Sequence, residues 1–172
     1  MASVAEHLVH QLEGAGVRHI YGIVGDSLNP VVDAVRRSKK IRWIHVRHEE
    51  TAAFAAAAEA EITGQLAVCA GSCGPGNLHL INGLYDANRS HLPVLAIASH
   101  IPTSQIGTGF FQETHPDRIF DECSVFSEMI SSSEQVPRVT RSAIQQALSN
   151  HGVAVSVSYT HLRAHETRED IV

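Results

Sequence analysis

The sequence predicts an α/β domain: a doubly wound, mostly parallel six-stranded sheet with helices on both faces. Three observations lead to this fold class. Short apolar runs alternate with stretches that have helical periodicity or helix-forming composition. The apolar runs show little polar alternation, as expected for strands of a sheet covered on both faces. Glycine-rich or polar turns follow several of the runs. Strands that alternate with helices in this way form β-α-β units.

Each element has its own signal along the chain. The first helix carries apolar residues at helical spacing and ends at Gly16, and the third is rich in alanine and glutamate and ends at Gly64. The expected strands are 19–24, 41–46, 66–71, 92–99, 125–131 and 152–158. The expected helices are 3–15, 28–37, 48–62, 78–88 and 134–150. Residues 100–123 contain two prolines and two glycines, so we expect a looser stretch there.

Composition narrows the function classes. The chain has 172 residues, is 44% hydrophobic and carries a net charge of −5, with scattered basic residues, which argues against nucleic-acid binding. Its three cysteines are too few for a disulfide scaffold and favour reduced thiols. No apolar run is long enough to span a membrane, and the N-terminus does not resemble a signal peptide. We therefore expect a cytoplasmic protein. The 12 histidines show no metal-binding spacing, so no metal ligands are assigned.

In a doubly wound sheet, ligands bind outside the carboxyl ends of the strands. Four turns are expected at that edge, at 25–27, 47–49, 71–77 and 100–113. Functional residues should therefore lie in these turns.

The turn GSCGPGN at 71–77 has two interpretations. Its glycines allow a ligand to approach the backbone closely, and the following helix offers free N–H groups. It matches neither GxxxxGK[ST] nor a GxGxxG motif after the first strand. The alternative is a glycine-rich turn that serves only the packing of strand and helix.

The motif RHEE at 47–50 also has two interpretations. Glutamates in the first turn of a helix are favourable against its dipole. A carboxylate at the ligand edge of the sheet could instead act on a substrate or on a cofactor nitrogen. The alanine-rich stretch 52–60 is either a core helix or part of a subunit interface, and Asp26 alone is typical of a turn or cap.

Taken together and in order, the motifs are specific. GVRHIYGIVGDSLNPVVDAV is followed by VRHEETAAFAAAAEAEITG, LAVCAGSCGPGNLHLINGLYDA, HLPVLAIASHIP and GTGFFQETHP. This series resembles the N-terminal domain of thiamine-diphosphate-dependent enzymes of the pyruvate oxidase and acetolactate synthase group. The resemblance covers roughly residues 3–155, and GSCGPGNLHLINGLYDA and FQETHP resemble the pyruvate oxidase branch more.

The resemblance implies that this domain binds the aminopyrimidine ring of thiamine diphosphate. The family's R-H-E glutamate, here Glu49, would hydrogen-bond the ring atom N1′ and favour the imino form of the 4′-amino group, which removes the C2 proton. The backbone at Gly74, Pro75 and Gly76 would meet the ring. Ser72 and His79 would supply further contacts; those two side chains flank the turn.

The resemblance also assigns residues near the reacting end of the cofactor. Gly25 and Asp26 match a loop that lies over this end. Related decarboxylases use an acid at this position together with a His-His pair, which this sequence lacks. Phe111 and Gln112 match the family's F-Q-E segment near the substrate.

The implied parent enzyme is a thiamine-diphosphate- and FAD-dependent pyruvate oxidase. It would convert pyruvate to acetate and CO2 and pass electrons to a quinone, in the cytoplasm or at the inner membrane face. FAD and Mg²⁺ would bind in further domains, and the diphosphate-binding domain would come from a second subunit of a homo-oligomer. We therefore expect this chain to be a truncated fragment, inactive alone. The alternatives are a fragment of an acetolactate synthase-like enzyme and a non-catalytic α/β binding module.

The C-terminus departs from the family pattern. After GVAV at 152–155 the chain continues SVSYTHLRAHETREDIV, which is polar and shows no core pattern. It resembles a translated sequencing adapter. We therefore assign residues 1–155 to the pyrimidine-binding domain and 156–172 to a non-native or disordered tail.

Overall fold

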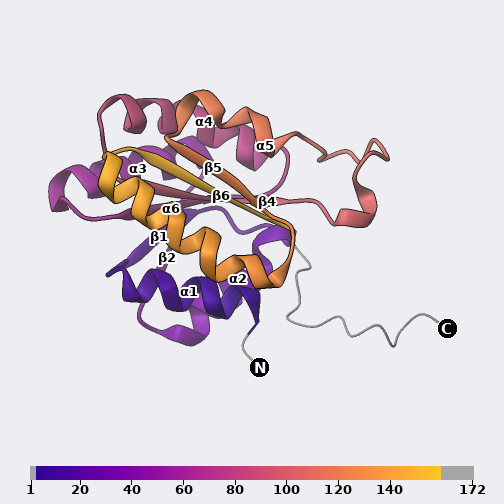
Figure 1. Cartoon of the computed structure of the whole chain (residues 1–172), viewed down its shortest axis with the longest axis horizontal. Helices are drawn as coiled ribbons and strands as arrows, with labels where there is room; N and C mark the ends of the chain where they lie inside the picture. Colours follow the sequence, from indigo (N-terminus) through magenta and orange to yellow (C-terminus); the bar gives the residue numbers. More distant parts are fainter. Residues whose placement is uncertain (1–2, 160–172) are drawn as a thin grey trace.

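A computed structural model describes residues 3–159 of the chain, and its core is one sheet of six parallel strands. The strands lie in the order β2-β1-β3-β4-β6-β5 (Figure 1). Their bounds are β1 His19–Gly22, β2 Arg42–His45, β3 Ala67–Gly71, β4 Val94–His100, β5 Phe126–Ile130 and β6 Val153–Tyr159. Every neighbouring pair is parallel. The predicted fold class is confirmed.

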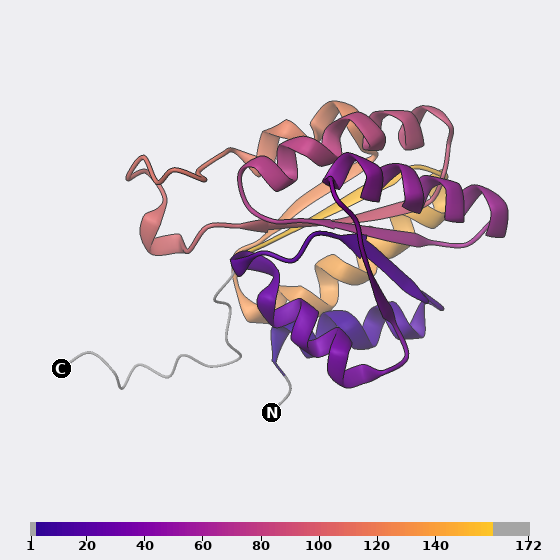
Figure 2. The same ribbon diagram turned by 180° about the vertical axis from the view of Figure 1, so that it is seen from behind.

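The helices form a layer on each face of this sheet. Helices α1, α2 and α6 pack on one face, and α3, α4 and α5 pack on the other (Figures 1 and 2). Their bounds are α1 Val4–Gly14, α2 Asn29–Ser38, α3 Glu49–Thr63, α4 Pro75–Arg89, α5 Pro116–Ile119 and α6 Val136–Asn150. None of the helices within residues 3–159 is long and apolar enough to cross a membrane.

The ends of the helices follow from local chemistry. Helix α1 begins with a capping box, in which Ser3 accepts from the Glu6 N–H and the Glu6 carboxylate accepts from the Ser3 N–H. Helix α3 ends at Gly64, which has a φ of 66° and donates its N–H to the Ala60 carbonyl. A glycine adopts this left-handed conformation without the steric cost that a Cβ brings.

Two segments differ from the sequence-based expectation. Helix α4 begins at Pro75 rather than residue 78, because the proline ring presets the helical φ at the first position. The looser stretch 100–123 contains the short helix α5, which also begins at a proline. Strand β6, Val153–Tyr159, agrees with the strand expected at 152–158 and therefore includes the first residues of the segment assigned to the tail. The rest of the predicted tail, 160–172, lies outside the described residues.

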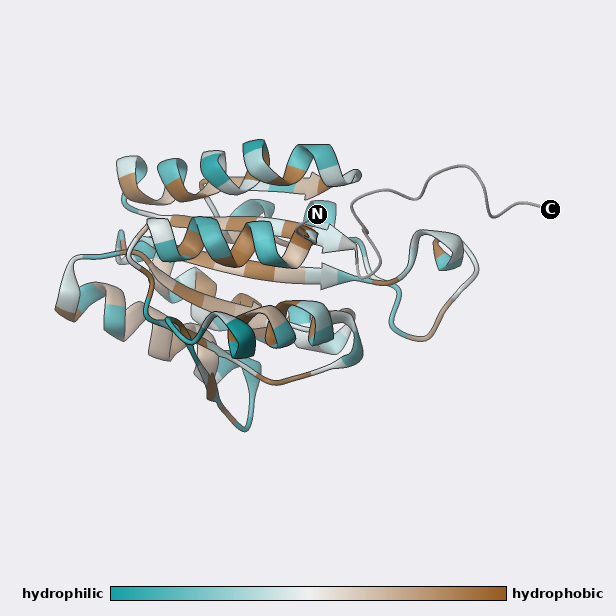
Figure 3. Cartoon of the chain, turned by 90° about the horizontal axis from the view of Figure 1, so that it is seen from below, coloured by the Kyte–Doolittle hydropathy of each residue, from teal (hydrophilic) through white to brown (hydrophobic). Residues whose placement is uncertain are grey.

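The apolar residues separate into two clusters, one on each face of the sheet. The strands alternate, so that Val68, Leu95 and Ile97 face the α1, α2 and α6 layer. Their neighbours Cys69 and Ala96 face α3 and α4. Figure 3 shows the hydrophobic colour along the strands between helices that carry hydrophilic residues.

The topology creates one crevice at the carboxyl edge of the sheet. From β1 the chain passes to β2 on one side through α2, then returns through α3 to β3 on the other side. The segments after β1 and β3 therefore leave the sheet toward opposite faces. A doubly wound sheet binds ligands at such a switch point.

Candidate functional site

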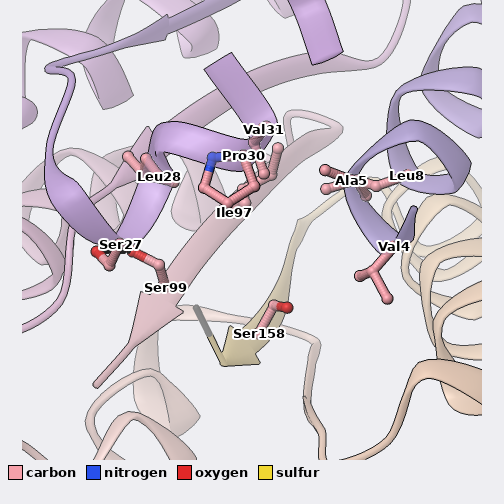
Figure 4. A pocket seen from close by; sticks show the side chains of 10 residues that line it. All are labelled: Val4, Ala5, Leu8, Ser27, Leu28, Pro30, Val31, Ile97, Ser99 and Ser158. Carbon is pink, nitrogen blue, oxygen red and sulfur yellow. Dashed lines mark hydrogen bonds between the residues drawn. The ribbon is translucent and has the colours of Figure 1, made fainter. Parts of the chain in front are cut away.

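Three buried or half-buried serines join the segments at this switch point. Ser27 follows β1, Ser72 follows β3, and Ser99 lies near the end of β4. The Ser27 Oγ lies 2.8 Å from the Ser72 Oγ and 2.6 Å from the Ser99 Oγ. Figure 4 shows Ser27 and Ser99 pointing toward each other beside a small cavity between α1, α2, β4 and β6.

The protons of these hydroxyls can be assigned. Ser99 donates to the Gly71 carbonyl, so its single proton is used and Ser27 must donate to Ser99. Ser27 then has only acceptor capacity left, which the Cys73 N–H fills at 3.0 Å and the Ser72 hydroxyl at 2.8 Å. Ser72 therefore donates its proton to Ser27.

The glycine-rich turn is fixed in place from both ends. The fully buried Asn77, in the first turn of α4, donates to the Ser99 carbonyl at 2.7 Å. Gly74 has a φ of 69°, and a Cβ there would come within 3.0 Å of the Gln112 backbone. A Cβ on Gly71 would lie 2.8 Å from the Gly76 carbonyl oxygen. The sequence therefore needs glycine at these positions for the turn to close.

Glu49 is the buried carboxylate of the site. It is the first residue of α3, and its side chain is 10% exposed. Its Oε2 lies 3.1 Å from the His79 Nδ1. Its Oε1 would lie 3.2 Å from a Cβ on Gly76, and the Ser72 Cβ would lie 3.3 Å from the same point. Because Gly76 has no Cβ, Oε1 can lie close to the backbone of the glycine-rich turn.

The neighbouring residues His48 and Glu50 have other partners. His48 is the N-cap of α3, and its Nδ1 accepts from the Glu50 N–H at 3.3 Å. The His48 ring stacks on the His79 ring with centroids 4.3 Å apart. The Glu50 carboxylate accepts from Asn82, one helical turn beyond His79 on α4. The two adjacent glutamates thus each bind α4, but only Glu49 is buried.

Close packing of α3 against α4 makes these contacts possible. A Cβ on Gly83 would lie only 2.6 Å from the Ala53 Cβ and 3.1 Å from the Glu50 carbonyl oxygen. Five alanines of α3 are buried at 0–3% exposure, namely Ala52, Ala53, Ala56, Ala57 and Ala60. The alanine-rich stretch is therefore a core helix, which was one of its two interpretations.

The two predicted substrate residues, Gln112 and Phe111, differ in their contacts with the glycine-rich turn. Gln112 packs over Gly74, and its Oε1 accepts from the Cys73 Sγ at 3.4 Å. Phe111 is 83% exposed and packs on Phe110, with centroids 4.8 Å apart, outside this cluster. Asp26 is exposed at the start of a single 3-10 turn after β1.

Glu113 organises the loop that carries these aromatic residues. Its carboxylate accepts from the Gly107 N–H at 2.6 Å and from the Gly109 N–H at 3.1 Å. These backbone donors, that of Gly107 first, hold the pKa of Glu113 below its ordinary value because they favour the charged form. The Glu113 carboxylate therefore holds the loop together through these hydrogen bonds. The loop projects from the edge of the sheet (Figures 1 and 2).

The cysteines are all free and buried. Burial raises the pKa of the Cys69 thiol to about 12 and that of Cys123 to about 11. Within residues 3–159, no group of three or more His, Cys, Asp or Glu side chains gathers where it could hold a metal ion.

The structure brings together most of the predicted site residues: Gly25, Ser72, Gly74, Pro75, Gly76, Glu49, His79 and Gln112. Sequence reasoning missed Ser27, Ser99, Asn77 and His48. Their signal was present, because Ser27 and Asn77 lie in the predicted turns and Ser99 is a polar residue at the end of an apolar strand.

Comparison with known proteins decides the family. Residues 2–120 match the family described as thiamine pyrophosphate enzyme, N-terminal TPP binding domain. The match covers more than half of the chain. The chain belongs to this family.

This thiamine pyrophosphate domain has full-length relatives of several kinds. It is 62% identical over 154 residues to an uncharacterized 42.6 kDa protein of Pseudomonas amyloderamosa, covering 90% of this chain and 39% of that protein. It is 42% identical over 149 residues to a pyruvate oxidase of Lactiplantibacillus plantarum, covering 86% and 25%. It is 37% identical over 145 residues to acetolactate synthase isozyme 1 large subunit of Escherichia coli, covering 84% and 26%. The chain thus spans about a quarter to two fifths of these relatives.

The residues present fit the pyrimidine end of the thiamine pyrophosphate of this family. A flat heterocycle needs space at the backbone and an acid for its ring nitrogen. Gly76 exposes backbone without a Cβ, and the Glu49 Oε1 lies beside this backbone. His79 binds the other oxygen, and no residue among 3–159 donates a hydrogen bond to Oε1. This oxygen can therefore accept a hydrogen bond from a ligand N–H.

Proposed function

We propose that this domain binds the aminopyrimidine end of thiamine pyrophosphate and that Glu49 is its catalytic residue. The buried Glu49 carboxylate, whose Oε1 lies beside the Gly76 backbone, is the observation that carries this proposal. A carboxylate in a mostly water-excluded place interacts more strongly with a ring nitrogen than an exposed one does.

Glu49 would hold a proton between its Oε1 and the ring nitrogen, as a positioned acid and base. When bound, thiamine pyrophosphate supplies an electron sink for the decarboxylation of 2-oxo acids. Gly74, Pro75 and Gly76 would present backbone to the ring, and the half-buried Ser72 would offer a lone pair beside it.

The loops around the crevice would receive the substrate. Gly25 lies against Ser72, where a Cβ would meet the Ser72 Oγ at 2.5 Å, so the loop after β1 can close over the ring. Gln112 would reach the substrate from above Gly74. Asp26 and Phe111 are both exposed, so they would reach a ligand only together with other parts of the enzyme.

For the whole protein we propose a pyruvate oxidase that forms acetate and CO2 and passes electrons through FAD to a quinone. The identity of 42% to the pyruvate oxidase, against 37% to the acetolactate synthase, supports this branch. Further domains would hold FAD and Mg²⁺, a second subunit of a homo-oligomer would supply the diphosphate-binding domain, and the enzyme would work in the cytoplasm or at the membrane face. An acetolactate synthase-like enzyme is the second candidate, since the identity of 37% to that synthase is only slightly lower than the 42% to the oxidase.

A pair of chimeras tests both candidates. The chain would replace the matching segment of the L. plantarum pyruvate oxidase and, separately, that of the E. coli acetolactate synthase. We expect pyruvate-dependent dye reduction in the first chimera and little acetolactate from the second. Glu49→Gln should lower the rate by about 10²-fold or more, because it removes an acid-base group, whereas Glu50→Gln should change it little.

Activity of the synthase chimera alone would favour the second candidate. Equal activity of the Glu49→Gln variant and the wild type would contradict the assignment of Glu49. If neither chimera is active while both are folded and bind thiamine pyrophosphate, the binding-module interpretation gains.

A further inference from the structure

We propose that His79 is a positioning residue for Glu49: it binds one carboxylate oxygen, so that Oε1 stays beside the Gly76 backbone, and the stacked His48 ring holds His79 in place. This inference rests on the proposed function, because it concerns how the same carboxylate is presented. Its evidence lies in the contacts of four side chains at the start of α3 and α4.

The first step concerns the hydrogen bond that His79 makes to one oxygen of the Glu49 carboxylate. Glu49 is 10% exposed, and its Oε2 lies 3.1 Å from the His79 Nδ1. Among residues 3–159, His79 supplies the one hydrogen bond to this side chain. A carboxylate with one oxygen bound no longer rotates freely. Oε1 therefore stays at the side of Gly76, where it would lie 3.2 Å from a Cβ.

The second step is the tautomer of His79. A carboxylate only accepts hydrogen bonds, so the ring nitrogen at 3.1 Å must carry the proton. A neutral His79 is thereby fixed with its proton on Nδ1. In water the neutral ring prefers its proton on Nε2, so this tautomer is a distinctive mark of the contact.

The third step is the support from His48. Its Nδ1 accepts from the Glu50 N–H at 3.3 Å, so a neutral His48 carries its proton on Nε2, the opposite tautomer. The two rings stack with 4.3 Å between centroids and 28° between planes. His79 is 45% exposed and would otherwise turn freely, so the stack restricts its ring.

Glu50 lies beside the stack. One of its oxygens accepts from Asn82, while Oε2 lies 3.7 Å from the His48 Nδ1, which carries no proton in this tautomer. Glu50 is therefore bound to Asn82 and does not compete for His79. The arrangement presents a single oxygen, in one orientation, to a ligand nitrogen.

The tautomers provide a test on the 172-residue chain without any cofactor. Nitrogen NMR of ¹⁵N-histidine-labelled protein at about pH 9, where an ordinary histidine is neutral, reports which nitrogen carries each proton. We expect His79 protonated on Nδ1 and His48 on Nε2. In Glu49→Ala, His79 should lose this preference, whereas the exposed His151 should not change. A proton on Nε2 of His79 in the wild type would overturn the proposal.

Two substitutions separate the donor from the ring. His79→Phe keeps a ring to stack but has no donor, and His79→Asn keeps a side-chain N–H but no ring. The probe is 4-amino-5-hydroxymethyl-2-methylpyrimidine, titrated into each variant by NMR. We expect His79→Phe to weaken binding by about 10-fold, as for loss of one hydrogen bond to a charged group. His79→Asn should retain binding within about 3-fold of wild type, a rescue by its donor.

Equal loss in both variants would show a role of the ring alone and contradict the positioning role. The proposed function fails by a different result, since it requires Glu49→Gln to weaken binding of the same probe. If wild type binds no probe, the tautomers still decide the positioning role.

Discussion

The two faces of the sheet differ in the side chains that meet beside α1 and beside α3. On the α1, α2 and α6 face the strands present Ile20, Val68, Leu95 and Ile97, which meet Leu8 and Leu12 of α1. On the other face β3 and β4 present Ala67, Cys69, Ala96 and Ala98, which meet the alanines of α3, whereas β6 presents Val153, Val155 and Val157. Large buried side chains bury more apolar area and so contribute more to stability. Small ones let backbones approach, and the candidate site lies on that side.

The close approach has a direct consequence for Glu49. With Gly83 against Ala53 and Glu50, the first turns of α3 and α4 lie near enough for Glu49 to reach His79 and for Glu50 to reach Asn82. Larger residues at the contact would separate these turns. We infer that the close contact of α3 with α4 supplies the geometry of the site.

The largest expected effect is on the first face. Leu12→Ala removes a fully buried side chain, which should lower the free energy of unfolding by about 2–5 kcal/mol. Urea unfolding measures this change, with Leu148→Ala, a 40% exposed position on α6, as the control. The histidine NMR signals of the site should stay as in wild type. If Leu12→Ala shifts these signals as much as a substitution on the α3, α4 and α5 face does, the proposed contrast between the two faces is wrong.

The next effect is on the second face. Gly83→Ala places a Cβ within 2.6 Å of the Ala53 Cβ and 3.1 Å of a backbone oxygen. Overpacking of this kind should cost about 1–3 kcal/mol and move α3 relative to α4. Unlike Leu12→Ala, it should also change the His48 and His79 signals.

The matched control for this change is Gly14→Ala. Gly14 also lies in a helix, as the last residue of α1, but a Cβ there would meet nothing within 4 Å. The control should not lose stability, because alanine favours the helix over glycine. If both variants lose the same stability, close helix packing does not explain the glycine at position 83.

The smallest effect concerns the cap of α1. The Ser3 backbone N–H and, after it, Arg37 lower the pKa of Glu6 from its ordinary value of 4.5. A lowered pKa stabilises the fold above pH 4.5, and this contribution is lost as the pH falls through the lowered value. Glu6→Gln should therefore flatten the pH dependence of urea unfolding below pH 4.5 and leave the site signals unchanged. An unchanged acid slope would contradict the effect of the cap.

The same contrast explains what could be predicted from the sequence. Alternating apolar runs and helix signals are local, so all six strands and the five longer helices followed from them. The motifs also pointed to Glu49 and the glycine-rich turn. The Ser27, Ser72 and Ser99 contacts join residues 45 and 72 positions apart, which no local pattern shows. His48 belongs to the RHEE motif, but the motif does not show its stacking on His79. That stacking depends on how closely α3 approaches α4.

The most direct test compares the two adjacent glutamates as ligands of an aminopyrimidine. Both lie in the first turn of α3, but Glu49 is buried beside Gly76, whereas Glu50 is half-buried and bound to Asn82. Dissociation constants for 4-amino-5-hydroxymethyl-2-methylpyrimidine would be measured for wild type, Glu49→Gln and Glu50→Gln. We predict a loss of about 10-fold or more for Glu49→Gln, as for a hydrogen bond to a charged group, and less than about 3-fold for Glu50→Gln. Equal dissociation constants for the two variants would contradict the account.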